Sequence, residues 1–494
     1  DVYKRQRRRT RGDDAREVRG VESRVPRRAR GDGGAVSRAP RGPPGIQRRG
    51  ARRFAEAARR GGGGVCRGDG GALGGVRGGA REAPRGRRGG ARRRAPSPGP
   101  GGVVRAYNIR TGELVWYWDP IPPNQEPILD DTGRQLYQRG TTNVWSIISA
   151  DPELNLVYLP TGNTAADNYG GHRNGLDYYS SSVVALNAST GEVVWHFQTV
   201  YHDIWDYDVP SQPTFYDIEK DGKIIKALAQ TTKMGLVFLL NRETGEPIFP
   251  VEERKVPQGS LEGENLSKTQ PFPTKPLPLN PINFDPDEAY GFTFWDRGYC
   301  KRTAKKLRNE GLYTPPSLQG SIHYPSAIGG NNWGGPAIDH SRNVMVVNTM
   351  NLASLIVMIP REDCNKSLED LAINDTQARF TAIEQNEGIP YCNLRSMGFF
   401  SPLRVPSTKP PWGTLSAVDL NTGDHLWNVP LGTSKDLAPF PFWWIKGAPN
   451  MGGPTVTASG VTFIGATSDH YLRAFNTETG EELAKFRLPT GGHA

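Results

Sequence analysis

The chain has 494 residues, and 61 Lys and Arg against 51 Asp and Glu give it a formal net charge of +10. A basic balance favours nucleic-acid binding only where it runs through the folded part of a chain. Residues 1–105 hold about 30 of the basic and about 9 of the acidic residues, which leaves roughly −11 for the remainder. The larger part of the chain is therefore acidic, and its charge argues against a nucleic-acid partner.

Residues 1–102 consist mainly of Arg, Gly, Ala and Pro and have no apolar periodicity, so they cannot bury a core. An RNA-binding arm would interleave aromatic side chains for stacking, but only Tyr3 and Phe54 precede Tyr107. Codons rich in G and C that are read out of frame give the same composition. We interpret 1–102 as a low-complexity tract, either disordered or a frameshift artefact, and exclude it from the fold.

The four cysteines, Cys66, Cys300, Cys364 and Cys392, show no C-x-x-C spacing, so they predict neither a zinc site nor a haem attachment. Cys364 and Cys392 either pair in an oxidising compartment or remain free thiols. Apolar runs such as 235–240 are too short to span a bilayer.

From Val103 onward one pattern recurs: Asn or Asp, two variable residues, Thr-Gly, and a large apolar residue four positions after the Gly. Such a unit predicts a β-hairpin, in which the Asn or Asp side chain caps the turn and Gly takes positive φ. The residue four positions on would pack between neighbouring sheets. The five copies are 108–112 with Trp116, 187–191 with Trp195, 241–245 with Phe249, 419–423 with Trp427, and 476–480 with Ala484.

Hairpins repeated every 55–80 residues or so predict an all-β fold, a β-propeller of four-stranded blades with insertions. The pattern lapses between Gly245 and Asp419, but 343–349 and 354–359 read as strands, so we expect at least one unmarked blade there. Residues 271–286 and 361–387 are expected to be long surface insertions.

The repeated unit resembles the docking motif of propellers that bind pyrroloquinoline quinone (PQQ), and the resemblance covers residues 103–494. It implies a ring of eight blades in the intact family. Because five or six can be counted here, we expect a partial propeller, truncated at both ends and marginally stable through its open sheet edges.

The resemblance assigns roles to two positions early in the chain. Trp145, in Asn143-Val144-Trp145, resembles the Trp that lies under the quinone, a role suited to a large flat indole. Asn163, in the turn 160–163, resembles an Asn that binds the metal ion in soluble relatives. Any buried Trp or turn Asn would look similar, so these two assignments depend on the resemblance.

The stretch 201–210 contains a His, three carboxylates and several aromatic residues. Taken alone it reads as a solvated acidic turn. Beside the repeats it resembles the H-D-x-W-D loop of PQQ dehydrogenases, and the resemblance makes Asp206 the catalytic base. Lys233, 27 residues later, resembles an active-site Lys that contacts the cofactor, although a Lys beside an apolar strand is also typical of a snorkelling side chain.

Later in the chain, Asn332, Trp333 and Asn348 resemble contacts to the rim of the quinone, while Gly-rich turns at strand ends would look the same. Residues 451–453 read Met-Gly-Gly where soluble relatives often place a second Trp. That departure is typical of the membrane-type branch that oxidises glucose, quinate or shikimate.

The resemblance thus implies oxidation of a sugar, polyol or cyclitol hydroxyl with PQQ and Ca²⁺ or Mg²⁺, and electron transfer to a membrane quinone of the ubiquinone type. It also implies a periplasmic location, with membrane association through an N-terminal region. The main alternative is a non-enzymatic propeller that acts as a scaffold for envelope assembly. Such a scaffold would keep the docking motif but has no need for Trp145, Asp206 and Lys233 together.

Overall fold

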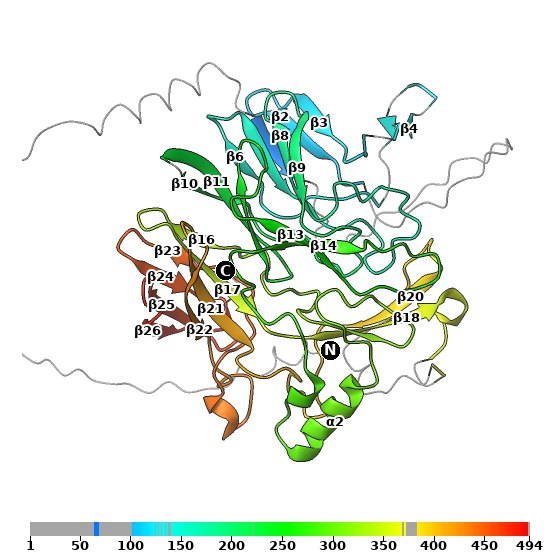
Figure 1. Ribbon diagram of the computed structural model, residues 1–494, viewed down its shortest axis with the longest axis vertical. Coiled ribbons are helices and arrows are strands. Elements are labelled where there is room, and N and C mark those ends of the chain that lie inside the picture. The colour runs from blue at the N-terminus through cyan, green and yellow to red at the C-terminus, as the bar shows by residue number, and fades with distance from the viewer. Residues whose placement is uncertain are drawn as a thin grey trace, which may run out of the picture. The chain divides into compact units, whose positions relative to one another are not determined.

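The structure is a computed structural model (Figure 1) that describes residues 64–68 and 101–492, except 124, 127, 130, 134, 137–139, 221, 368–369 and 372–382. All of these residues belong to one compact unit, Gly62–Ala494. Apart from 64–68, the tract 1–102 lies almost entirely outside the described residues. No helix in the described part of the chain is long and apolar enough to cross a membrane.

Five antiparallel sheets follow one another as blades, as the all-β propeller prediction requires. The first three blades contain β1 (Gly64–Gly68), β2 (Val104–Asn108) and β3 (Leu114–Trp118); β6 (Ser149–Asp151), β7 (Leu156–Pro160), β8 (Ser182–Asn187) and β9 (Val193–Gln198); and β10 (Thr214–Lys220), β11 (Lys223–Thr231) and β12 (Val237–Asn241). The last two contain β16 (Ala337–Asp339), β17 (Val344–Met350), β21 (Gly413–Asp419) and β22 (His425–Pro430); and β23 (Thr455–Val456), β24 (Val461–Ile464), β25 (Tyr471–Asn476) and β26 (Glu482–Arg487).

The remaining elements lie in connections between these blades or between strands of one blade. A further four-stranded sheet, the side sheet, consists of β15 (Ser321–His323), β18 (Ser354–Pro360), β20 (Tyr391–Ser396) and β19 (Ile383–Glu384). There are also two strand pairs, β4 (Ile128–Leu129) with β5 (Gln135–Leu136) and β13 (Val251–Lys255) with β14 (Thr269–Pro273). The helices are α2 (Phe294–Ala304) and the 3₁₀ turns Pro286–Glu288, Arg361–Asp363 and Phe442–Trp444.

The five repeated motifs form the predicted turns. In the second copy the Asn187 side chain accepts hydrogen bonds from the backbone N–H groups of Ser189 and Thr190, at 2.9 and 3.2 Å. Gly191 has a φ of +77°, and its N–H donates to the Asn187 carbonyl. A side chain at this glycine would be strained, which explains why each copy has Gly there.

Each large residue of the motif lies on the glycine of the following copy, and these contacts join the blades. Trp195 is the clearest example: a Cβ built on Gly245 would come within 2.6 Å of its ring. The Trp195 indole N–H also donates to the Arg242 carbonyl in the same turn, at 3.1 Å. The other pairs are Trp116 on Gly191, Phe249 on Gly423 and Trp427 on Gly480.

The apolar cores follow the same order, because each one joins two successive blades. The core between the second and third blades, for example, packs Tyr158 and Trp195 against Leu228 and Phe238. Non-directional burial of this kind supplies the bulk of the stability, while the docking contacts fix the order.

The topology separates two kinds of loop. In the second blade the turns after β6 and β8 lie together, because the Ala188 N–H donates to the Asn155 carbonyl. The connections after β7 and β9 lie together at the other end, where the Thr199 N–H donates to the Ser181 carbonyl. The docking turns therefore occupy one end of the blades, and the long variable connections occupy the other.

The side sheet corrects the prediction for the unmarked segment. The strands predicted at 343–349 and 354–359 are confirmed as β17 and β18, but they belong to different sheets. The docking contact runs directly from Phe249 to Gly423, so the side sheet stands outside the docking series. Its strands β18, β19 and β20 are inserted between β17 and β21, while β15 precedes β16. Local strand patterns do not reveal which sheet a strand joins.

Three further features differ from the sequence expectations. Gly64–Gly68, inside the excluded tract, pairs with β2, because an open strand edge accepts any extended backbone. Residues 271–286 are not simply a surface insertion, since Phe272 in β14 is buried in the core of the second and third blades. Helix α2 was not predicted; the Thr293 side chain caps it by accepting from the Asp296 N–H.

The alternative left open for the cysteines resolves in favour of pairing. Cys364 and Cys392 form a disulfide, which ties the segment after β18 to β20 within the side sheet. Cys300 is a buried free thiol in α2.

The docking contact gives a direct stability prediction. Gly245→Ala places a methyl group against Trp195, and we expect a loss of about 2–4 kcal/mol in the free energy of unfolding. Gly112→Ala is the matched control, because Gly112 has a φ of +74° in the same turn but nothing within 4 Å of its Cβ position. It should cost only about 1–2 kcal/mol. Equal losses in urea unfolding would show that the contact with Trp195 contributes little.

Candidate active site

The best-defined cluster of charged side chains lies at the end of the blades that carries the long connections. Lys233, in the short loop between β11 and β12, donates to both the carbonyl and the Oδ1 of Asp206, each at 2.8 Å. It also donates to Asp208 Oδ2 at 2.9 Å. The side chains of Lys233 and Asp206 are only 7% and 18% exposed. The structure thus brings together the predicted base and the predicted Lys.

A cation missed by the sequence analysis completes this cluster. Arg395, on β20 of the side sheet, donates from Nη1 to Asp206 Oδ2 at 2.6 Å. Both oxygens of Asp206 are therefore held by cations. No local signal marks Arg395, because it lies 189 residues from Asp206 and only the insertion of the side sheet brings it near. Asp208 was visible in the sequence as one of the three carboxylates but was not given a role.

These contacts shift the pKa values in opposite directions. Burial alone would raise the pKa of Asp206, but the positive charges of Lys233 and Arg395 outweigh burial and lower it. Burial would lower the pKa of Lys233, but Asp206 and Asp208 raise it above its ordinary value. At neutral pH the Asp206 carboxylate and the Lys233 ammonium are therefore both charged.

Two more predicted residues reach the cluster through Asp208. The Trp145 indole N–H donates to Asp208 Oδ2 at 3.2 Å, and the Asn163 backbone N–H donates to Asp208 Oδ1 at 2.5 Å. A Cβ on Gly162 would lie 3.2 Å from the Trp145 ring, so this glycine lets the indole lie close to the backbone. Trp145 and Asn163 thus border the same site as Asp206.

The loop that carries Asp206 is held in an uncommon conformation. Asp206 and His202 have φ values of +61° and +47°. Residues other than Gly rarely adopt this region of backbone conformation. His202 is clamped between Asp177 and Glu264, at 2.7 Å from Nδ1 and 2.6 Å from Nε2. Burial lowers the pKa of His202, but the hydrogen bonds to the two carboxylates outweigh this and raise it to about 9. The protonated His202 therefore fixes the start of the loop.

The Gly-rich segment that carries Asn332 and Trp333 supports the backbone of Lys233. The Gly330 N–H donates to the Lys233 carbonyl at 2.6 Å, and a Cβ on Gly329 would lie 2.9 Å from Lys233 Cα. The Asn332 amide donates to the Ile328 carbonyl, while the Trp333 side chain is 43% exposed.

Asn348 lies one step further along the same network. The Met350 N–H donates to the Gly330 carbonyl, which joins the end of β17 to the segment beneath Lys233. The buried Asn348 donates from Nδ2 to Asn450 Oδ1 at 2.5 Å, and its Oδ1 has no partner among the described residues. Asn348 therefore offers a buried acceptor near the site rather than a member of the ion-pair cluster.

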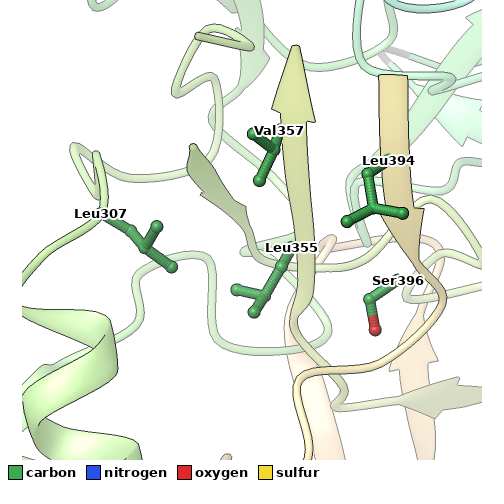
Figure 2. A pocket seen from close by; sticks show the side chains of 5 residues that line it. All are labelled: Leu307, Leu355, Val357, Leu394 and Ser396. Atoms are coloured by element: carbon green, nitrogen blue, oxygen red, sulfur yellow. The ribbon is translucent and has the colours of Figure 1, made fainter. Parts of the chain in front are cut away.

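A small apolar pocket lies on the face of the side sheet opposite to Arg395 (Figure 2). Leu394 and Ser396 point into it from β20, facing Leu355 and Val357 on β18, while Leu307 closes one side. Because successive residues of a strand alternate between faces, Arg395 points to the opposite face. The side sheet thus packs apolar side chains on one face and presents Arg395 to Asp206 on the other.

Comparisons with known proteins agree with the propeller fold. Residues 89–494 match a family model described as "PQQ: Glucose/ethanol/alcohol dehydrogenase, beta-propeller domain". The quinoprotein glucose dehydrogenase of Escherichia coli is 38% identical over 404 residues, which covers 80% of this chain and 49% of that protein. The quinate/shikimate dehydrogenase (quinone) of Acinetobacter baylyi is 38% identical over 398 residues, 79% of this chain and 49% of that protein.

A solved structure supports the fold alone. The quinohemoprotein alcohol dehydrogenase from Comamonas testosteroni aligns with a TM-score of 0.51 and 22% identity, over 80% of this chain and 50% of that one. The chain spans about half the length of the curated relatives it matches.

The His202 clamp makes stability depend on pH in the neutral to alkaline range. Because the folded-state pKa is raised, the stabilisation is complete below the unfolded value near 6.5 and is lost as the pH rises through about 9. We expect His202→Gln to cost on the order of 3 kcal/mol at pH 6 and much less at pH 10. The exposed His340 gives the control variant His340→Gln. Parallel stability curves for the wild type and His202→Gln between pH 6 and 10 would contradict this account.

Proposed function

Since the chain belongs to the β-propeller domain family of PQQ-dependent glucose, ethanol and alcohol dehydrogenases, we propose that it oxidises a hydroxyl group of a sugar, polyol or cyclitol. The observation that carries the proposal is the pairing of Asp206 with Lys233 beside Trp145. A proton acceptor, a fixed cation and a flat indole lie at one place, and alcohol oxidation needs the first two together.

The residues of the site fit a planar quinone that carries carboxylates. Trp145 offers a flat polarisable face, and the absence of a side chain at Gly162 lets this indole lie close to the backbone. Lys233 offers an ammonium group with its charge retained. The buried oxygens Asn348 Oδ1 and Asn143 Oδ1 have no protein partner within the described ranges. Asn332 and Trp333 would lie at the rim of the same cofactor.

The described residues supply only part of a binding site for the metal ion. Asn163, whose backbone N–H donates to Asp208, carries a side-chain amide oxygen, and oxygen ligands suit Ca²⁺ or Mg²⁺. Across the part of the chain that the structure describes, no group of three or more His, Cys, Asp or Glu side chains is arranged to hold a metal ion. We therefore propose Asn163 as one ligand of the ion and assign no others.

In the proposed reaction Asp206 accepts the proton of the substrate hydroxyl. Its lowered pKa keeps it ionised at neutral pH, and each carboxylate oxygen keeps a lone pair beyond those used by Lys233 and Arg395. Lys233 places positive charge where negative charge develops on the acceptor. When bound, PQQ supplies the group that accepts the hydride from the substrate carbon.

We further propose that the electrons pass to a membrane quinone and that the domain works in the periplasm. The support is the similarity to the quinoprotein glucose dehydrogenase and the quinate/shikimate dehydrogenase (quinone). The scaffold alternative is not favoured, because docking between blades does not require buried opposite charges, which are costly to desolvate.

The role of Asp206 can be tested by Asp206→Asn in the intact gene product supplied with PQQ and Ca²⁺. Dye-linked oxidation of aldoses, polyols and cyclitols should require PQQ in the wild type. In the variant kcat should fall by about 10² to 10⁴-fold, the usual contribution of a general base. Retained PQQ binding by the variant would exclude misfolding as the cause. Near-normal kcat in the variant would rule Asp206 out as the base.

The role of Trp145 can be separated from its hydrogen bond to Asp208. Trp145→Ala removes the flat ring, and we expect the Kd for PQQ to rise about 10 to 100-fold. Trp145→Phe keeps an aromatic face without the N–H, so its Kd should rise less than about tenfold. Titration of the protein with PQQ, followed by absorbance, measures both values. Equal effects would mean that the hydrogen bond, not the ring, matters for binding.

A further inference from the structure

A rim of charged side chains surrounds the outer side of Asp206. Arg395 contacts Glu384 on β19, with 3.2 Å between Arg395 Nη2 and Glu384 Oε1, and Asp167, with 3.6 Å between Nη2 and Oδ2. Asp167 belongs to the connection between β7 and β8. We call Asp167, Glu384 and Arg395 the carboxylate rim. It joins the side sheet to the second blade through Arg395, which also contacts the proposed base.

The two carboxylates of the rim face solvent, whereas the guanidinium does not. The side chains of Asp167 and Glu384 are 44% and 38% exposed, and that of Arg395 is 13% exposed. A molecule that approaches Asp206 from this side therefore meets carboxylate oxygens first. These oxygens accept hydrogen bonds from hydroxyl groups.

The guanidinium has little capacity left for an anionic ligand. Its Nη1 donates to Asp206, and its Nε and Nη2 lie 3.2 Å from Glu384 Oε1. A bidentate grip on a substrate carboxylate would first have to break these charge-assisted contacts. Arg395 therefore serves to hold the rim together and to fix Asp206.

The charge count of the whole site points the same way. Four carboxylates face two cations, Lys233 and Arg395; the carboxylates are Asp167, Asp206, Asp208 and Glu384. Burial and the nearby Asp206 raise the pKa of Asp167 to about 7, although solvent screens part of this effect. Even with Asp167 protonated, carboxylates outnumber cations. His323 beneath the site adds no positive charge, because burial lowers its pKa to about 3.

We propose that the carboxylate rim selects neutral polyhydroxylated substrates, such as polyols, aldoses or carboxyl-free cyclitols, over substrates that carry a carboxylate. This inference rests on the proposed function and sharpens it. Overall similarity does not make the choice, because the relatives include both a glucose and a quinate/shikimate dehydrogenase at 38% identity.

The test compares matched pairs that differ in the carboxylate: myo-inositol with quinate, and glucose with glucuronate. For each pair that the intact gene product oxidises, we expect kcat/KM to be at least about tenfold higher for the neutral member than for the anionic member. Raising the ionic strength from about 0.02 M to about 0.3 M should increase kcat/KM for the anionic member and leave the neutral one unchanged.

Variants locate the effect in the rim. Glu384→Gln should raise KM for the neutral substrate while kcat changes little. The ratio of kcat/KM for the neutral substrate to kcat/KM for the anionic one should fall by about threefold or more. Glu219→Gln is the matched control, because Glu219 is exposed beside the turn that joins β10 to β11, whereas Lys233 follows the opposite end of β11. This control variant should change neither KM for the neutral substrate nor the ratio of the two kcat/KM values. An unchanged ratio in Glu384→Gln would remove the rim from substrate selection.

Binding separates failure of this inference from failure of the proposed function. Calorimetric titration with myo-inositol and quinate, without an electron acceptor, needs no turnover. Tighter binding of quinate, or binding of neither ligand, would overturn the rim proposal. Absence of PQQ binding and of any PQQ-dependent oxidation would overturn the proposed function, while preferential binding of the neutral ligand would still support the rim.

Discussion

The contact between a large apolar side chain and the glycine of the next turn is the constraint on which this structure depends. A side chain at Gly245 would collide with Trp195, and the indole N–H completes the contact with a hydrogen bond to the Arg242 carbonyl. Because the contact uses only a turn and one side chain, it leaves the connections at the other end of each blade free to vary. The insertion of β18, β19 and β20 between β17 and β21 is tolerated for this reason.

That freedom is what assembles the site. Asp206, Lys233 and Arg395 come from three different connections, and their charges neutralise one another at low exposure. Isolated buried charges are costly. Both cations contact Asp206, while Lys233 also contacts Asp208 and Arg395 also contacts Glu384. The positive φ of Asp206 and the clamp on His202 show that the loop is fixed before any ligand arrives. A preorganised base needs less rearrangement during the reaction.

The sequence predicts the parts of this architecture that repeat or that carry a local motif. The turns, the docking residues and the blade strands follow from spacing and turn chemistry, and Asp206, Lys233, Trp145 and Asn163 do gather at one place. Arg395 and Glu384 could not be predicted, because their strands lie in an unmarked insertion whose partners are set by tertiary packing. Helix α2 was also missed, since its capping Thr293 lies in a segment without apolar periodicity.

The most direct measurement is a crystal structure of the intact gene product with PQQ bound. The account predicts that the ring system lies on the face of Trp145 with an oxygen about 3 Å from Lys233 Nζ, and that Asp206 lines the remaining open side. A quinone bound elsewhere, or bound with Asp206 turned away from it, would contradict the assignment of this cluster as the active site.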